Sequence, residues 1–268
     1  MLLLGKTVIV TGGTHGIGRS IVMGCAAEGA NVVFSGRDEA AAEDVLREIG
    51  KTKAPRGEVR FVRADLTDAE ACFTLVESTV KRYGRLDGLV NNAGIFPPGT
   101  MLDTSVETLD NVLSVNVRAA FLLCQRAITH MLKHGGSIVN IGSTHADAGS
   151  PGIAAYAVSK GALRTLTRHI ALNYIGAGIR ANWITVGWVL TEGDYAAQRG
   201  RGLDDEQIRA NAAERIPSGR YQAGSEIADA TVFLLSDKSI SHTDTDMRVT
   251  GGFMPGFSLP PGIERNQD

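Results

Sequence analysis

Cysteine is scarce in this sequence, and the few cysteines show no metal-binding pattern. The 268 residues contain only Cys25, Cys72 and Cys124, whose wide spacing differs from the close pairs of zinc sites. An odd number of widely spaced thiols favours reduced core cysteines in a cytoplasmic protein. We therefore expect no metal site and no disulfide framework.

Long apolar runs and a strong net charge are also absent. No run approaches the roughly 20 apolar residues of a membrane span, and the leading MLLL, which Lys6 soon follows, is too short for a secretory signal. The formal net charge of −2 gives no reason to expect nucleic acid or an anionic membrane as a partner. With 43% hydrophobic residues, the chain can instead bury a large core.

Strand-like and helix-like segments alternate along the chain. Apolar segments predict strands within residues 6–11, 31–35, 58–65, 86–94, 136–143 and 179–187, and helices are expected at about 16–28, 39–48, 69–83, 106–133 and 154–174. Such alternation predicts a parallel sheet between two helical layers. We predict one doubly wound α/β/α domain over residues 1–252, followed by a C-terminal tail at 253–268.

Four glycines fall within TGGTHGIG, residues 11–18, directly after the apolar run KTVIV. Glycine loses the most backbone freedom on folding, so their concentration needs a reason. Backbone N–H groups at a turn that opens a helix bind phosphate, and ligands of open α/β sheets lie at the carboxyl ends of the strands. The segment predicts a phosphate-binding turn, although a tight turn that needs positive φ would also use glycine.

A second group of residues predicts acid–base chemistry at the same sheet edge. Tyr156 and Lys160 are four residues apart in an expected helix and share one face. A lysine ammonium nearby favours the phenolate, so we expect Lys160 to lower the pKa of Tyr156 from its usual value near ~10. Tyr156 could then exchange a proton with an alcohol or carbonyl oxygen, and Ser143, at the end of a strand, could hold that oxygen.

These motifs together resemble the classical short-chain dehydrogenase/reductase family. The resemblance extends to about Gly252 and includes TGGTHGIG, NNAG at 91–94, SVN ending at Asn116, IVNIGS ending at Ser143 and YAVSK at 156–160. It implies a Rossmann-like fold, a nicotinamide cofactor and hydride transfer at a carbinol carbon. The implied catalytic tetrad is Asn116, Ser143, Tyr156 and Lys160.

The resemblance also implies a set of cofactor-binding residues, in which Asp65 would bond adenine and Lys160 the nicotinamide ribose. The set expected to line the cofactor cleft is Gly12, Thr14, His15, Gly16, Ile17, Gly18, Arg37, Asp65, Leu66, Asn92, Ala93, Gly94, Tyr156, Lys160, Gly187, Val189 and Thr191.

Two positions depart from the family pattern. Val186 stands where proline is expected in NWITVGWVLT, and Thr250 occupies the acidic place of VTGG. Valine keeps the N–H that proline lacks and leaves φ free, so the turn beside the nicotinamide is expected to differ in shape. Neutral drift would explain both changes equally well.

The end of the second strand bears on the choice between NADP and NAD. NAD enzymes place an acidic residue there to bond the ribose 2′-hydroxyl, whereas this chain has Gly36 followed by Arg37. Arg37 could clamp a 2′-phosphate, and His15 supplies a second basic group in the glycine turn. We favour NADP over NAD, although Arg37 could stack on adenine and Asp38 could swing inward.

The predicted activity is hydride transfer between this cofactor and a secondary alcohol or ketone. Residues 187–222 are expected to form a substrate loop, or lid, and a small polyhydroxy or sugar-like substrate is favoured by polar and aromatic residues near the site: Phe96, Thr144, His145, Asp147, Trp188, Glu192, Asp194, Tyr195, Arg199 and Arg201. The alternatives are a 3-oxoacyl thioester reductase, a lyase or epimerase, and a non-catalytic nucleotide sensor. The resemblance also implies a homotetramer.

Overall fold

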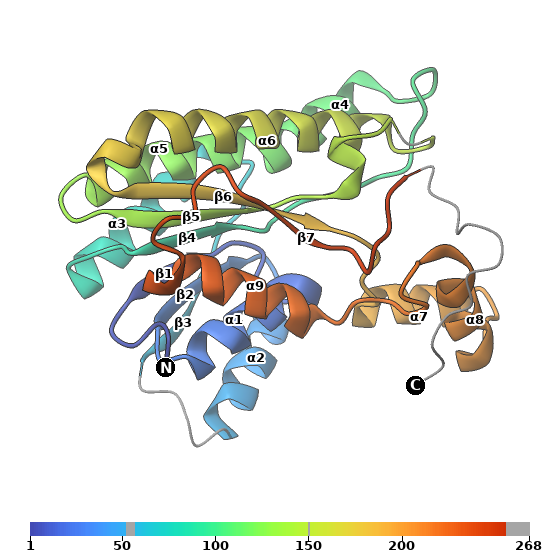
Figure 1. The fold of residues 1–268 in the computed structure, drawn as a ribbon, viewed down its shortest axis with the longest axis horizontal. Helices are drawn as coiled ribbons and strands as arrows, with labels where there is room; N and C mark the ends of the chain where they lie inside the picture. The colour runs from blue at the N-terminus through green and yellow to red at the C-terminus, as the bar shows by residue number, and fades with distance from the viewer. Residues whose placement is uncertain (52–56, 150, 256–268) are drawn as a thin grey trace.

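The computed structural model describes residues 1–51, 57–149 and 151–255, and its centre is one parallel sheet (Figure 1). In this part of the chain, seven strands lie in the order β3-β2-β1-β4-β5-β6-β7. Their bounds are β1 Thr7–Val10, β2 Asn31–Gly36, β3 Val59–Arg63, β4 Gly88–Asn91, β5 Gly136–Ile141, β6 Ile179–Val186 and β7 Asp246–Val249. The order reverses between β1 and β4, where doubly wound sheets bind their ligands.

Helices cover both faces of the sheet (Figure 1). On one face lie α1 Gly16–Ala27, α2 Glu39–Lys51 and α9 Gly224–Leu235; on the other lie α3 Ala69–Tyr83, α4 Val106–Leu113, α5 Ala119–Met131 and α6 Ala154–Tyr174. Each layer buries an apolar cluster against the sheet. The predicted three-layer, Rossmann-like architecture is confirmed, whereas the C-terminal tail mostly lies outside the described residues.

The segment after β6 contains helices that the sequence pattern did not single out. Helix α7 spans Glu192–Gly200 and helix α8 spans Asp205–Arg215, and both project to one side of the sheet (Figure 1). Asp204 caps α8 in a reciprocal capping box with Gln207, and the helix buries Ile208 and Ala212. The predicted loop at 187–222 is therefore largely helical.

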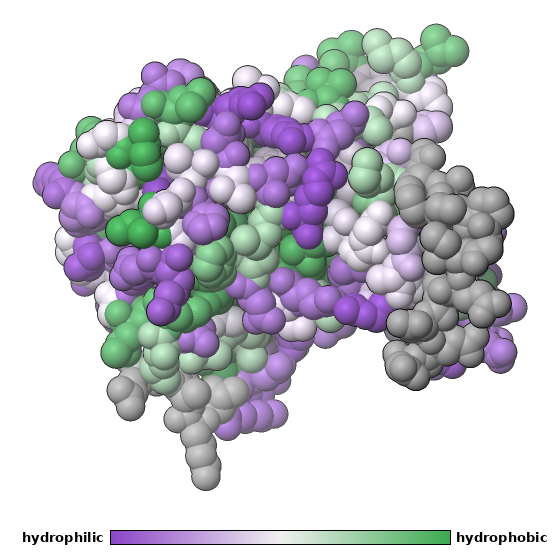
Figure 2. Space-filling model, viewed as in Figure 1, coloured by the Kyte–Doolittle hydropathy of each residue, from purple (hydrophilic) through white to green (hydrophobic). Residues whose placement is uncertain are grey.

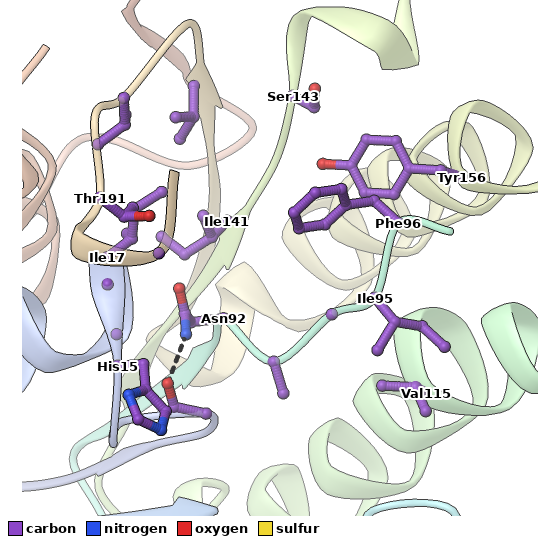
Figure 3. Close-up of a pocket in the computed structure, with 18 of the residues that line it drawn as sticks. His15, Ile17, Asn92, Ile95, Phe96, Val115, Ile141, Ser143, Tyr156 and Thr191 are labelled. Carbon is purple, nitrogen blue, oxygen red and sulfur yellow. Dashed lines mark hydrogen bonds between the residues drawn. The ribbon is translucent and has the colours of Figure 1, made fainter. Parts of the chain in front are cut away.

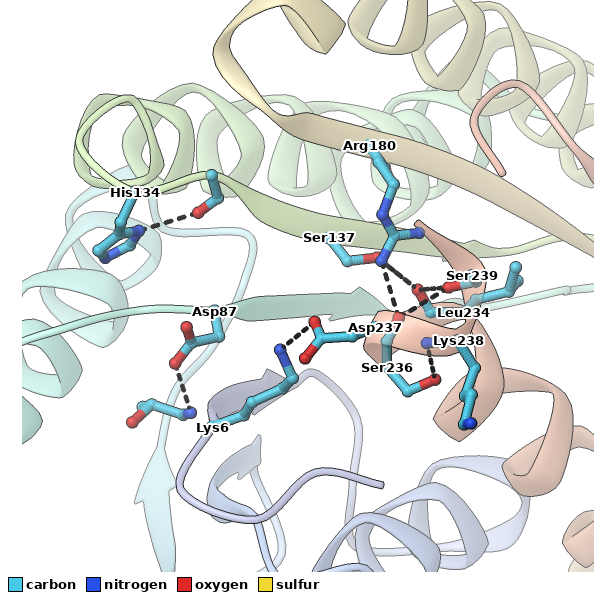
Figure 4. Close-up of polar contacts among 12 residues, drawn as sticks. Lys6, Asp87, His134, Ser137, Arg180, Leu234, Ser236, Asp237, Lys238 and Ser239 are labelled. Carbon is cyan, nitrogen blue, oxygen red and sulfur yellow. Dashed lines mark hydrogen bonds and ion pairs between the residues drawn. The ribbon is translucent and has the colours of Figure 1, made fainter. Parts of the chain in front are cut away.

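A buried polar cluster closes the amino-terminal edge of the sheet, opposite the glycine turn (Figure 4). Arg180 of β6 donates to the carbonyl oxygens of Leu234 (2.9 Å) and Ser236 (3.3 Å), and Ser137 of β5 also donates to Leu234 (2.7 Å). Carbonyls at a helix C-terminus lack partners within the helix. The cluster satisfies those of α9 and joins this helix to β5 and β6.

The three cysteines are free thiols in the core, as predicted. Burial raises the pKa of Cys25 and of Cys124 to about 12 and that of Cys72 to about 11. Thiols held in the protonated form are poor nucleophiles and poor metal ligands. Among the described residues, no group of three or more His, Cys, Asp or Glu side chains could hold a metal ion.

Helix length alone would allow one membrane span. The continuous helical segment Val106–Met131 has 26 residues and is apolar enough to cross a bilayer by length and composition. Many of its apolar side chains, among them Leu123, Ala127 and Met131, are buried in the apolar cluster between the sheet and the layer of α3, α5 and α6. It is therefore a core helix of this fold.

The face shown in Figure 2 mixes hydrophilic and hydrophobic residues, and one group of hydrophobic residues lies at its upper right edge. The loop between β4 and α4 projects at this side of the molecule (Figure 1), and its Met101 and Leu102 are 87% and 99% exposed. Thr100 and Asp103 close this loop through a hydrogen bond between their side chains at 2.7 Å. The loop tip therefore presents two apolar side chains to solvent.

Candidate active site

A cavity of about 1310 Å³ lies at the carboxyl edge of the sheet, where the strand order reverses. The glycine turn and Asn92 border one end, and Ser143, Tyr156 and Phe96 border the other (Figure 3). A cavity that runs between two such ends suits an elongated ligand with its reacting part beside Tyr156.

The glycine turn leaves no room for side chains where the chain folds back on itself. Gly12 and Gly16 have φ values of +64° and +53°, which favour glycine. A Cβ at Gly18 would lie 2.0 Å from the carbonyl oxygen of Gly12. In the described structure no side chain caps the N-terminus of α1, and its first turn has no acidic residue, so its N–H groups and helix dipole suit an anion. These features fit the pyrophosphate of a dinucleotide.

Thr11 and Asn92 tie the glycine turn to the segment after β4. The hydroxyl of Thr11 accepts from the N–H groups of Asn92 (3.0 Å) and Ala93 (3.1 Å). The Asn92 amide donates in return to the carbonyl oxygens of Thr11 (2.9 Å) and Gly12 (3.1 Å), and Figure 3 draws one hydrogen bond of this amide. Thr11 was not among the residues expected to bind the cofactor, and its position beside Gly12 was the available signal.

The end of β2 has no space for an acidic side chain. A Cβ at Gly36 would lie 2.8 Å from Cγ2 of Thr14. Arg37, which follows, lines the cavity together with Asp65. Hydrogen bonds from the N–H and hydroxyl of Thr67 (3.0 and 2.8 Å) hold the Asp65 carboxylate and lower its pKa. A carboxylate at position 36 is therefore excluded unless Thr14 moves.

Tyr156 and Lys160 lie together at the other end of the cavity. Lys160 is buried, and its Nζ donates to the carbonyl oxygen of Ile141 at 2.7 Å and lies 5.6 Å from the centre of the Tyr156 ring. Burial lowers the pKa of Lys160 to about 8. The expectation that Lys160 lowers the pKa of Tyr156 is wrong here: burial raises the pKa of Tyr156, and a hydrogen bond with Ser143 opposes this rise.

Ser143 ends the strand segment that faces Tyr156. Its hydroxyl accepts from the N–H of His145 at 3.2 Å, which fixes the short helical turn Thr144–Ala146. A Cβ at Gly142 would overlap the indole of Trp183 at 2.1 Å, so the backbone before Ser143 rests on that ring. The hydroxyl of Ser143 is thus held beside the phenol that it bonds.

Asn116 occupies a π-helical turn, Ser114–Arg118, between α4 and α5. Such turns are rare and are common at functional sites. The Asn116 side chain accepts from the N–H of Ile95 (2.8 Å) and donates to its carbonyl oxygen (2.9 Å) and to the hydroxyl of Ser159 (2.9 Å). Asn116 lies behind the cavity wall and, unlike the other predicted site residues, does not line the cavity.

The segment after β6 borders the cavity beside the glycine turn. Val186 pairs in register with Val249 of β7, so valine in place of proline lets the strand run to the turn. A Cβ at Gly187 would lie 2.7 Å from Cα of Thr250, which places this glycine directly against the backbone of Thr250. Thr191 caps α7, and its methyl group would lie 3.1 Å from a Cβ at Gly16.

Several polar residues of the segment 187–222 bind one another. Asp194 completes the capping box of α7, and Asp205 accepts from the hydroxyl of Tyr195 (2.6 Å) and pairs with Arg199 (3.5 Å). Tyr195, Arg199, Arg201 and Asp147 do not line the cavity, whereas Phe96, Thr144, His145, Trp188, Glu192 and Asp194 do. Around Tyr156 the described walls include the rings of Phe96 and His145, with centroids 6.0 and 6.3 Å from the phenol ring.

All the residues predicted from the sequence to bind the cofactor line this one cavity, and so does Ser143. The cavity is also lined by residues that were not predicted: Ser35, Asp38, Ala64, Ile95, Asn111, Val115, Ile141, Gly142, Ile153, Val186, Gly193 and Ala197. Most of these contribute backbone or apolar walls, for which the sequence has no distinctive motif.

Comparisons with known proteins agree with this geometry. The model of a family described as enoyl-(acyl carrier protein) reductase matches residues 12–254. L-fucose dehydrogenase of Bos taurus is 35% identical over 261 residues, which cover 96% of this chain and 93% of that protein. The 2-(S)-hydroxypropyl-CoM dehydrogenase 3 of Xanthobacter autotrophicus is 35% identical over 252 residues, 93% of this chain and 97% of that protein.

A solved structure supports the same assignment. A short-chain dehydrogenase/reductase from Serratia marcescens superimposes with a TM-score of 0.84 at 35% sequence identity, covering 94% of this chain and 99% of its own. Sequence and fold thus match over nearly the whole length. The chain belongs to the short-chain dehydrogenase/reductase family and is a nicotinamide-dependent oxidoreductase of alcohols and ketones.

Proposed function

We propose that this enzyme interconverts a small polyhydroxy, sugar-like alcohol and its ketone, with NADP as the preferred cofactor. The single observation that carries the catalytic assignment is the position of Ser143, Tyr156 and Lys160 in one cavity with the glycine turn. The bound nicotinamide supplies or accepts the hydride. Tyr156 gives or takes the proton of the reacting oxygen, and Ser143 holds that oxygen.

Lys160 and Asn116 support Tyr156 in this proposal. Lys160 holds a buried positive charge beneath the phenol ring, and its Nζ is anchored at the carbonyl oxygen of Ile141. Asn116 fixes the backbone at Ile95 and reaches Ser159, whose hydroxyl donates to the carbonyl oxygen of Tyr156 at 2.7 Å. The proposed proton path therefore starts from a fixed tyrosine.

The substrate proposal rests on the walls around Tyr156. Phe96 and His145 offer ring faces and a polar imidazole within one small region, which suits a ring with hydroxyl groups, and one relative is named L-fucose dehydrogenase. The alternative is a 3-oxoacyl thioester, since the matching family description names an acyl-carrier substrate. We expect oxidation of sugars or cyclic polyols in a panel that also contains sugar acids and acyl thioesters. Turnover of acyl thioesters alone would contradict the substrate proposal.

The NADP preference rests on the end of β2. Gly36 carries no carboxylate, Thr14 leaves no space for one, and Arg37 lines the cavity. We expect kcat/KM to be higher with NADP than with NAD, and Arg37→Ala to lower only the NADP value, by about tenfold, since charge-assisted contacts are worth about 1.5–3 kcal/mol. Preference of the wild type for NAD, or equal losses with both cofactors, would rule out a phosphate clamp at Arg37.

A homotetramer is proposed from the outer surfaces of α5 and α6. Phe121, Val158 and Leu172 are 51%, 61% and 67% exposed on these helices, and apolar side chains on neighbouring helices suit contact with a second copy. Light scattering should give a mass near four chains at micromolar concentration, and Phe121→Asp should reduce it. A monomeric mass for the wild type would refute the tetramer.

Two further proposals concern the loop and the location. Residues 187–222 would act as a substrate lid, since Thr191 and Glu192 already border the cavity at the glycine turn.

A cytoplasmic location is proposed because Cys25, Cys72 and Cys124 are all free and buried, as expected of a reducing compartment.

A further inference from the structure

An ion pair lies at the end of the cavity where β2 stops. Nε2 of His15, in the glycine turn, is 3.1 Å from Oδ2 of Asp38, and both residues line the cavity. His15 appears in Figure 3 at the end of the cavity far from Tyr156. In dinucleotide-binding sheets the adenosine ribose lies beside the end of the second strand. The pair therefore stands where the cofactor carries either a 2′-hydroxyl or a 2′-phosphate.

The Asp38 carboxylate is held in place and charged. Its Oδ1 accepts from the N–H of Ala41 at 3.0 Å at the start of α2, and its Oδ2 faces His15. The hydrogen bond from Ala41 and then the one from His15 lower the pKa of Asp38. Asp38 thus stays ionised at neutral pH, whereas histidine is the type of side chain whose charge changes between about pH 5 and 8.

The other charged groups near the pair keep their charge over the same range. They are Arg37 and Asp65, which interact electrostatically; Arg63, which pairs with Glu39 at 3.3 Å; and Arg19, one turn along α1, which binds Glu48 and Glu192. Guanidinium groups and carboxylates do not titrate between about pH 6.5 and 8.5. Among these groups, His15 alone carries an imidazole.

We propose that His15 and Asp38 form a proton-dependent selector of the cofactor, which is a specificity role beyond the phosphate clamp assigned to Arg37. With His15 protonated, the pair is neutral and admits the 2′-phosphate of NADP. With His15 neutral, the pair carries the full negative charge of Asp38, which repels a phosphate dianion and leaves the 2′-hydroxyl of NAD unaffected. The inference rests on the proposed function only in requiring a nicotinamide dinucleotide in this cleft.

The test is a binding measurement that involves no turnover. Dissociation constants of NADP and NAD are measured by titration calorimetry at about pH 6.5 and about pH 8.5 for the wild type, His15→Gln and Asp38→Asn. Glutamine keeps a hydrogen-bonding group without the titrating charge, and asparagine caps a helix about as well as aspartate. The 2′-phosphate has its own pKa near ~6, and His15→Gln measures that contribution separately.

We expect the ratio of the NADP to the NAD dissociation constant to rise about three- to tenfold between the two pH values in the wild type. His15→Gln should lose this rise, and Asp38→Asn should bind NADP several-fold more tightly than the wild type at the higher pH. The same change of this ratio with pH in the wild type and His15→Gln, or unchanged NADP binding in Asp38→Asn, would overturn the selector. Tighter binding of NAD by the wild type at both pH values would instead overturn the NADP preference. The change of the ratio with pH would still decide the role of the pair.

Discussion

Replacement of Tyr156 by Phe is expected to lower kcat by about 10²- to 10⁴-fold, the usual contribution of a positioned acid–base group. The ring would remain between Phe96 and His145, so the cavity keeps its shape. Only the hydroxyl that exchanges a proton with the reacting oxygen is lost. Cofactor dissociation constants and thermal stability should therefore stay close to those of the wild type.

Tyr83→Phe is the matched control for this experiment. Its hydroxyl donates to Glu58 at 3.0 Å at the end of α3, and Tyr83 does not line the cavity. This variant loses the same atom and should keep the wild-type kcat. Retention of more than about a tenth of kcat by Tyr156→Phe would remove Tyr156 as the acid–base group.

The pKa of Tyr156 bears on the direction of catalysis. Burial raises it, and the nearby ammonium does not reverse that shift. A phenol that stays protonated at neutral pH can donate to a ketone oxygen, whereas alcohol oxidation needs the phenolate. Ketone reduction should accordingly be favoured near neutral pH, and alcohol oxidation should become faster as the pH rises.

The strands that build the sheet core were predictable because their residues are buried on both faces. TVIV of β1 and IRANWITV of β6 are buried at every position, and such strands are rich in apolar and β-branched residues. Strand β7 was not predicted, since DMRV is a half-exposed edge strand of four residues. Helix α8 was missed because only two of its eleven residues, Ile208 and Ala212, are buried, too few for a helical period.

The site was predictable where chemistry demands particular residue types. Glycines at 12, 16 and 18 and the pair Tyr156 and Lys160 are local patterns, and they meet because parallel strands end at one edge. Lys160 is anchored by the backbone carbonyl oxygen of Ile141. Every residue has a backbone carbonyl, so no residue type in the sequence indicates this contact. The wrong expectation for the pKa of Tyr156 has the same origin, since burial of the phenol depends on tertiary packing.

The glycine turn itself is tested most directly by Gly18→Ala. Glycine at this position is a steric requirement, because the new methyl group would lie 2.0 Å from the carbonyl oxygen of Gly12 and 2.4 Å from Nδ2 of Asn92. Neither neighbour can yield easily: the first is backbone, and Asn92 bonds both Thr11 and Gly12. The first turn of α1 must then move away from the phosphate site.

We expect Gly18→Ala to lower the free energy of unfolding by about 1–3 kcal/mol, as overpacking does, and to weaken binding of either cofactor by about tenfold or more. Denaturant unfolding and calorimetric titration measure the two effects. Gly50→Ala is the control, because Gly50 lies near the end of α2 and its Cβ would meet no atom within 4 Å. That variant should be neutral or more stable by up to about 1 kcal/mol, since alanine favours the helix. Unchanged cofactor binding in Gly18→Ala would mean that the turn does not hold the pyrophosphate.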